Sequence, residues 1–224
     1  MLHGVRFGAI VASTLAVSLG GSLSASDEQP YSGPDVFDVN IVVDSGFVRN
    51  TSNERSVIYS TLVQAEEAGW MRGVMDEARL GAAPRDGQPS IIRVTSLLDG
   101  AVQHLDAKRL AQWRNTTAYF NGSSLLVEII ADPGAEPSRI VSTTARIGPA
   151  VPEPDPADSI CFSVDDRQLS FDDRVGRIMP VECTAWLIDD ANHCFLTAGH
   201  CTFNVDTMQF NVPLSTPGGT PQHP

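Results

Sequence analysis

The fold class is indicated most clearly by the segment Ser90-Ile-Ile-Arg-Val-Thr-Ser-Leu97, which is followed by Asp99-Gly100. It is rich in β-branched residues, which favour strands, and it ends at a residue pair that tolerates positive φ and forms tight hairpin turns. Asn121-Gly122 has the same chemistry between apolar runs. Four other segments share the β-branched composition and are bounded by turn-forming residues: 36–43, 56–63, 124–130 and 139–147. The sequence therefore predicts a mainly β protein with an antiparallel β-sandwich within residues 26–148.

Two further segments of this region are shorter or less regular. In Gly69-Trp-Met-Arg-Gly-Val-Met75 the apolar residues fit a helical stripe, but the two glycines interrupt it, and we predict a strand. Asp106-Ala-Lys-Arg-Leu-Ala-Gln-Trp113 is predicted to be a helix, because Asp106 is a suitable N-cap.

Length and charge limit the possible classes of function. The chain has 224 residues, of which 42% are hydrophobic and 19% charged, as in globular proteins of one or two domains. Fifteen basic residues stand against 27 acidic ones, so the formal charge is −12, and Lys108 is the only lysine. This charge argues against binding to nucleic acid. After residue 26 no uncharged apolar run reaches 18 residues, which argues against an internal membrane span.

The first 25 residues have the pattern of a secretory signal peptide. His3 and Arg6 precede an apolar run from Phe7 to Leu19, and a Gly/Ser-rich end leads to Ala25. This pattern predicts cleavage near Ala25 and a protein secreted to the extracellular or periplasmic space, without stable membrane association afterwards. The alternative is a retained membrane anchor, against which the polar Gly/Ser-rich end counts.

The composition changes abruptly after residue 148. Pro149-Ala-Val-Pro-Glu-Pro-Asp-Pro156 contains four prolines, too many for a helix or a central strand. Between residues 153 and 173 there are seven acidic residues and one basic residue, Arg167. We expect residues 149–160 to form a stiff, acidic linker, which is either a solvated spacer or a regulatory segment.

Few residues before the linker suggest a functional site. His104 has no Cys or His close to it in the sequence, which favours a packed or surface histidine over a metal ligand. The region has four aromatic residues that could line a carbohydrate groove: Trp70, Trp113, Tyr119 and Phe120. Aromatic residues of a sandwich more often form its core.

The last region, residues 161–224, contains a second hairpin pattern. The segment from Cys183 to Ile188 predicts a strand, residues 189–192 a turn, and residues 194–197 a returning strand. The small residues that follow predict a corner that exposes His200. A histidine in such a place can titrate near neutral pH and act as a general base. Without comparison to any protein family, however, the residues favour a structural role for this histidine.

The hairpin region contains Thr197-Ala-Gly-His200-Cys201, preceded by Cys183-Thr-Ala-Trp-Leu-Ile188. Together these two segments resemble the histidine segment of chymotrypsin-like serine endopeptidases. Gly199 stands where animal members of that family usually have alanine. The resemblance covers about residues 160–205, and it implies the first strands of a trypsin-like β-barrel domain that acts on protein or peptide substrates. It also implies that His200 is the general base that takes the proton of a nucleophilic serine, with no cofactor.

Four cysteines lie in the last third of the chain, and four cysteines allow three pairings. The resemblance implies a disulfide between Cys183 and Cys201, which leaves Cys161 to pair with Cys194. A zinc site is the alternative, with ligands drawn from Cys183, His193, Cys194, His200 and Cys201. Export favours disulfides and the spacing matches no common zinc pattern, so we expect no metal.

The catalytic aspartate and serine of the family follow the histidine far downstream, and no residue of this chain matches either. Asp206 is too close to His200, and Ser215 lacks the Asp of a Gly-Asp-Ser-Gly-Gly motif. Asp44-Ser45-Gly46 precedes the histidine and is followed by Phe47. We therefore expect the amino-terminal part of a longer precursor, and no peptidase activity from these 224 residues alone.

The sequence thus predicts part of a secreted serine endopeptidase, with residues 26–148 as a pro-region or accessory domain. Residues 92–103 and 113–122 are weakly similar to the amino-terminal portions of secreted bacterial proteases. The alternative is a non-enzymatic extracellular protein, whose sandwich binds a glycan or a protein and whose trypsin-like segment is a remnant. The sequence indicates neither the oligomeric state nor the substrate preference.

Overall fold

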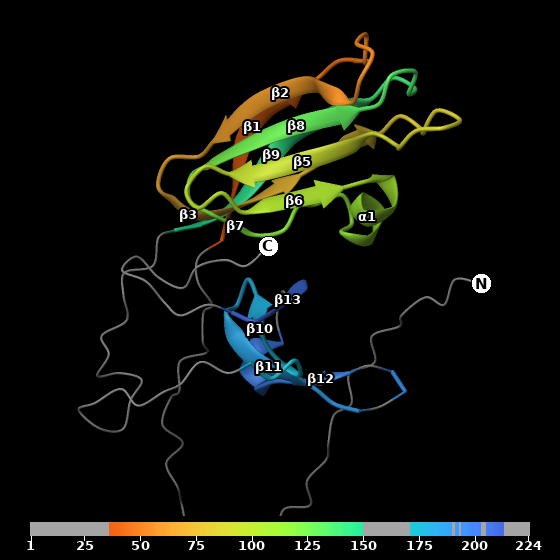
Figure 1. Ribbon diagram of the computed structural model, residues 1–224. Helices are drawn as coiled ribbons and strands as arrows, with labels where there is room; N and C mark the ends of the chain where they lie inside the picture. Colours follow the sequence, from red (N-terminus) through yellow and green to blue (C-terminus); the bar gives the residue numbers. More distant parts are fainter. Residues whose placement is uncertain (1–35, 150–170, 190, 193, 203–204, 213–224) are drawn as a thin grey trace, which may run out of the picture. The chain divides into compact units, whose positions relative to one another are not determined.

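The computed structural model describes residues 36–149, 171–189, 191–192, 194–202 and 205–212. The described residues are mainly β, with 51% of them in strands and 6% in helices, and none of the described sheets closes into a barrel. Residues 36–149 form two antiparallel sheets, and a third antiparallel sheet follows in residues 175–210 (Figure 1). The predicted fold class, mainly β with an antiparallel sandwich, is confirmed.

The first sheet has the strand order β1-β9-β3-β7, and β4 also pairs with β9. Its strands are β1 (Phe37–Asp44), β3 (Ala68–Val74), β4 (Glu77–Arg79), β7 (Phe120–Asn121) and β9 (Arg139–Pro149). The central strand is β9, the longest, because β1 pairs along one side of it and β3 and β4 pair along the other. Its last residue, Pro149, is also the first residue of the predicted linker.

The second sheet has the order β2-β8-β5-β6. Its strands are β2 (Ser56–Gln64), β5 (Ile91–Ser96), β6 (Val102–Leu105) and β8 (Ser124–Ala131). Alternate residues of a strand point to opposite faces, and the core-facing side of β5 and β8 carries the large buried side chains Ile92, Val94, Leu125, Val127 and Ile129, together with the smaller Ser96 and Ala131. On the other face of this sheet, Arg93 donates from Nε to Glu128 Oε2 at 2.7 Å, across paired strands.

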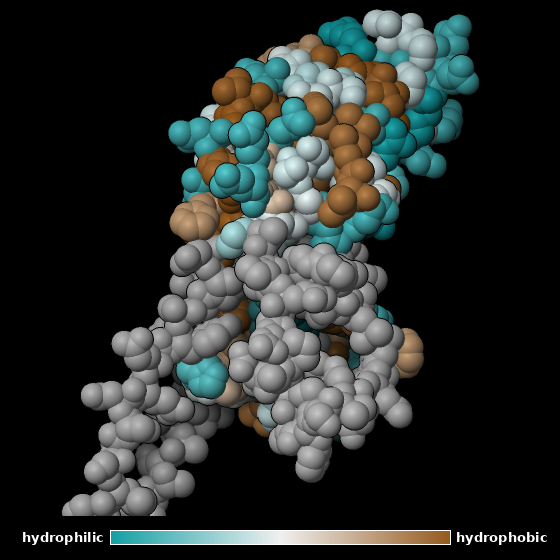
Figure 2. Space-filling view, turned by 90° about the vertical axis from the view of Figure 1, so that its left-hand side faces the viewer, coloured by the Kyte–Doolittle hydropathy of each residue, from teal (hydrophilic) through white to brown (hydrophobic). Residues whose placement is uncertain are grey.

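The core lies between these two sheets. Ile92 and Ile129 of the second sheet belong to the same buried cluster as Met71, Ile140 and Ala145 of the first sheet. All five side chains are fully buried. At the surface of the sandwich, apolar and hydrophilic side chains are interspersed in the view of Figure 2.

The helix α1 (Ala107–Gln112) follows β6. The Asp106 side chain accepts a hydrogen bond from the Arg109 N–H at 2.7 Å, and Leu110 is buried in the core. This confirms the predicted helix and its N-cap. Among the described residues, no helix has the length and apolar character that crossing a membrane requires.

The five predicted strands of the sandwich match β1, β2, β5, β8 and β9, and the strand predicted over residues 69–75 matches β3. The short strands β4, β6 and β7 were not predicted as separate elements.

The third sheet has the order β12-β11-β10-β13. Its elements are β10 (Val175–Met179), β11 (Cys183–Leu187), β12 (Phe195–Leu196), the 3-10 helix η2 (Gly199–Cys201) and β13 (Thr207–Phe210). Its small core consists of Ile178, Val181, Ala185 and Cys201. The predicted hairpin is confirmed, because β11 and β12 pair antiparallel.

Several sequence predictions fall outside the described residues. These are the signal peptide, the linker after Pro149, Cys161, His193 and Ser215.

Candidate active site

The β11–β12 hairpin places His200 at its end. Trp186 pairs with Leu196 and Leu187 with Phe195, and the Ile188 N–H donates to the Cys194 carbonyl at 3.0 Å. After β12 the chain turns into η2, where the Cys201 N–H donates to the Ala198 carbonyl at 2.9 Å. His200 is the middle residue of this 3-10 turn and is exposed.

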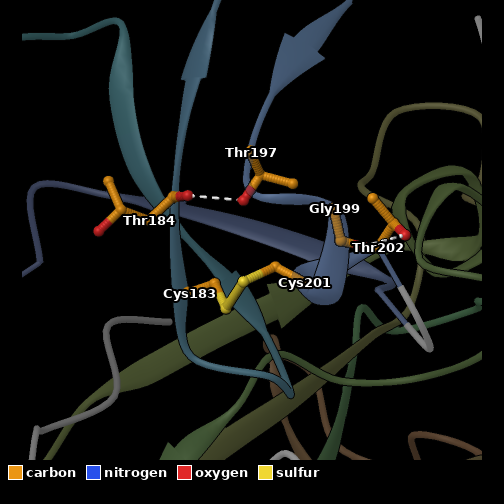
Figure 3. Close-up of a disulfide and its surroundings, with 6 residues drawn as sticks. All are labelled: Cys183, Thr184, Thr197, Gly199, Cys201 and Thr202. Atoms are coloured by element: carbon orange, nitrogen blue, oxygen red, sulfur yellow. Dashed lines mark hydrogen bonds between the residues drawn. A yellow bond between two sulfur atoms is a disulfide. The ribbon is translucent and has the colours of Figure 1, made fainter. Parts of the chain in front are cut away.

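Three side-chain links fix the corner around His200 (Figure 3). Thr197 Oγ1 donates to the Thr184 carbonyl at 2.8 Å, which ties the end of the hairpin to β11. Thr202 Oγ1 donates to the Gly199 carbonyl at 2.8 Å and closes the 3-10 turn. A disulfide joins Cys183 to Cys201, with a Cα–Cα distance of 6.1 Å. The backbone on both sides of His200 is therefore held by covalent or hydrogen bonds.

The Cys183–Cys201 disulfide is the pairing that the resemblance implies. Its sulfurs lie at the edge of the small core, where Cys201 is 2% exposed. Cys161 lies outside the described residues, so the Cys161–Cys194 disulfide remains a prediction.

One group of described residues has the geometry of a metal site. The ligand atoms of Cys183, His200 and Cys201 lie within 4.8 Å of one another. Zinc binds the cysteine thiolate, and here the two sulfurs are bonded to each other. With the disulfide in place this group offers a single imidazole, which does not fit a zinc ion.

Asp206, six residues after His200, is engaged with the sandwich. Its carboxylate accepts a hydrogen bond from Arg72 Nη1 at 2.6 Å and one from the Tyr119 hydroxyl at 3.0 Å. A catalytic aspartate has to orient the histidine instead. These contacts agree with the rejection of Asp206 on grounds of sequence spacing.

Arg72 is the centre of this polar cluster and is 6% exposed. Nε donates to the Thr117 carbonyl at 2.9 Å, Nη2 donates to Thr116 Oγ1 at 2.6 Å, and the guanidinium carbon lies 4.8 Å from the Tyr119 ring centroid. Burial raises the pKa of Tyr119 above its usual range, against the opposing effect of Arg72, so the hydroxyl stays protonated and can donate to Asp206.

No pattern in the sequence predicts this cluster as a whole. One residue of the cluster is nevertheless noticeable in the sequence: Arg72 is the one charged residue in the apolar segment 69–75. A charge inside a buried strand requires a partner, so Arg72 alone indicates that a polar cluster is present.

Asp44-Ser45-Gly46 forms a structural turn after β1. Asp44 Oδ2 accepts from Arg139 Nη2 at 2.8 Å, and the Gly46 N–H donates to Asp44 Oδ1 at 2.9 Å. These two interactions lower the pKa of Asp44 to about 2. Ser45 Oγ accepts from the Ile140 N–H at 2.9 Å and donates to the Gly46 carbonyl at 2.8 Å. This serine therefore has a local structural role, in agreement with its rejection as a nucleophile.

The other candidates of the sandwich have structural positions. His104 is an exposed residue of β6 opposite Arg93. Trp70 is 4% exposed, Tyr119 and Phe120 are fully buried, and Trp113 packs against the core. Three of the four aromatic residues are therefore buried, as expected for core residues, and Trp113 is partly buried.

Comparisons of the chain with protein-family models, with curated proteins and with solved structures find no significant match. Its function must therefore be inferred from its own residues and their geometry.

Proposed function

We propose that residues 161–224 are the beginning of the catalytic domain of a secreted, chymotrypsin-like serine endopeptidase, with His200 as its general base. The observation that carries the proposal is the position of His200: exposed, at the end of a rigid hairpin, and adjacent to the Cys183–Cys201 disulfide. Four cysteines allow three pairings, and the Cys183–Cys201 disulfide belongs to the pairing that the resemblance implies.

The chemistry of a general base agrees with this position. The imidazole must stay within hydrogen-bond reach of a serine hydroxyl throughout the reaction, so the backbone that carries it must be fixed. The disulfide and the Thr197 and Thr202 hydrogen bonds supply that constraint. Exposure of His200 leaves its side chain accessible to a serine from another segment.

The proposal places the catalytic serine and aspartate outside these 224 residues. Asp206 is engaged by Arg72 and Tyr119, and Ser45 belongs to a turn of the sandwich. Residues 26–148 are then a pro-region or an accessory domain. The 224 residues by themselves should not cleave casein, because the nucleophile that forms an acyl-enzyme is missing.

The test is covalent labelling of the full secreted product. The coding sequence beyond Pro224 should first be read for a Gly-Asp-Ser-Gly-Gly motif. A fluorophosphonate probe should then label the secreted protein, and His200→Ala should slow labelling by about 10⁴-fold or more, since removal of the base leaves the serine unactivated.

His104→Ala is the matched control, because it removes an exposed histidine from β6. It should label at the rate of the unchanged protein. Labelling that survives His200→Ala would refute the assignment of the base. A secreted product that the probe does not label, with no such motif after Pro224, would favour the non-enzymatic binding protein instead.

A further inference from the structure

Two residues of the third sheet and its flanks, which are neighbours in space, contact the sandwich. Met179, at the end of β10, is fully buried and packs with Trp70 and Tyr119. Asp206 lies just before β13, and its backbone N–H donates to the Met179 carbonyl at 3.0 Å. Because β10 and β13 are paired, with Met179 opposite Thr207, the sheet presents an apolar and an acidic residue side by side.

The sandwich meets these two residues with complementary chemistry. The Trp70 and Tyr119 rings, 4.9 Å apart in an edge-to-face arrangement, pack against Met179. Arg72 and the Tyr119 hydroxyl bind the Asp206 carboxylate, and Arg146 Nη1 lies 3.9 Å from Asp206 Oδ2. The side chains of Arg72 and Asp206 are 7% and 26% exposed, so water screens their ion pair weakly.

From these contacts we propose that the sandwich, residues 36–149, is a non-covalent binding partner of the sheet β10–β13, and that it holds the sheet through Met179 and Asp206. The contacts come from side chains outside the segment 150–170, which joins the two parts of the chain. The two parts therefore stay associated when that segment is cut. This binding goes beyond the proposed function and is the same whether or not His200 is catalytic.

The cysteines make the test unambiguous. All four lie at or after residue 161, so no disulfide can link residues 36–149 to the rest of the chain. Replacement of residues 152–156 by the recognition sequence of a site-specific protease allows the full chain to be cut between its two parts. Association of the two pieces can then come only from non-covalent contacts.

The cut protein should elute from a size-exclusion column as one complex under non-reducing conditions. Asp206→Asn removes the charge that Arg72 and Arg146 face, and should weaken the association of the pieces at least 10-fold in a dilution series. Met179→Ala removes the apolar contact and should also weaken it, without any change of charge. Each variant is cut only after it elutes as a folded, uncut protein.

Asp44→Asn is the matched control, because it also replaces an aspartate carboxylate by an amide, but in an ion pair that lies wholly within the sandwich. Its pieces should associate like those of the parent protein. The proposal is wrong if the parent pieces separate on the column, or if Asp206→Asn and Met179→Ala dissociate no more readily than Asp44→Asn. Because the readout is association, loss of the protease assignment would leave this result unchanged.

Discussion

His200 follows two small residues, and the second of them is glycine, where the animal endopeptidases that this segment resembles usually have alanine. Ala198 has extended backbone angles (φ −65°, ψ 144°), and Gly199 begins the 3-10 turn. Gly199 does not have a φ in the left-handed region, and a Cβ added to it would meet no atom within 4 Å among the described residues. The fold therefore does not require glycine at this position.

Gly199→Ala should leave the fold intact and raise the free energy of unfolding by up to about 1 kcal/mol, because alanine restricts the unfolded chain. Thermal denaturation followed by circular dichroism measures this change. Gly122→Ala is the contrasting variant, since φ is +85° there and a Cβ would lie 2.9 Å from Leu98 Cβ. It should lower the melting temperature. If Gly199→Ala is as destabilising as Gly122→Ala, the corner is more crowded than described.

The residues of the candidate site differ in how far the sequence could predict them. Cys183 and Cys201 are 18 positions apart and His200 lies between them, so a single segment carries the whole pattern. Arg72 and Asp206 are 134 residues apart, and neither has a neighbour in the sequence that indicates the other. Such a contact forms only when two segments far apart in the sequence pack together, which local patterns do not encode.

At the scale of elements, the predictable strands of the sandwich are the longer ones, with six to eleven residues. β5 and β8 alternate β-branched or aliphatic core residues with outward ones, so composition alone identifies them. β4 has three residues, Glu-Ala-Arg, and β7 has two, Phe-Asn. These short strands exist because β9 and β3 offer unpaired backbone groups beside them, which is a tertiary effect.

The Asp44–Arg139 ion pair joins the end of β1 to β9. The contribution of this ion pair to the stability of the fold should depend on pH. Hydrogen bonds from Arg139 and the Gly46 N–H lower the pKa of Asp44 to about 2, compared with about 3.9 in an unfolded chain. A lowered carboxyl pKa stabilises the fold above the unfolded pKa, and this stabilisation is lost as the pH falls through about 2.

Asp44→Asn should therefore lower the melting temperature at pH 6, and the difference from the parent protein should shrink between pH 4 and pH 2. Circular dichroism melts across this range measure it. Glu66→Gln, at an exposed carboxylate between β2 and β3, is the control for loss of one negative charge. A difference for Asp44→Asn that stays constant from pH 6 to pH 2 would contradict the assigned pKa.

At the scale of the whole molecule, the sequence of the linker predicts where the proposed precursor is processed. Proline disfavours helices and strands, and acidic side chains favour contact with water, so the sequence of residues 149–156 predicts the stretch that is most accessible to proteases. Arg167 and Arg174 are the basic residues that a trypsin-like processor could use there. The many acids would suit a glutamate- or aspartate-directed one.

Maturation should cut between about residues 149 and 173, and amino-terminal sequencing of the secreted product is the measurement. A mature chain that begins within this range identifies the sandwich as a pro-region. A mature chain that begins near residue 26 shows instead that the sandwich is a permanent accessory domain.

The position of β2 has a consequence for how the molecule behaves in concentrated solution. Among the described residues β2 pairs only with β8, so its outer side presents backbone N–H and C=O groups to which another chain could add. Its sequence, Ser-Val-Ile-Tyr-Ser-Thr-Leu-Val-Gln, has no charge and no proline to discourage such growth. Electrostatic repulsion from the net charge of −12 keeps copies apart at neutral pH, and it vanishes near the isoelectric point of about 4.6. Mildly acidic conditions therefore favour aggregation that starts at this edge.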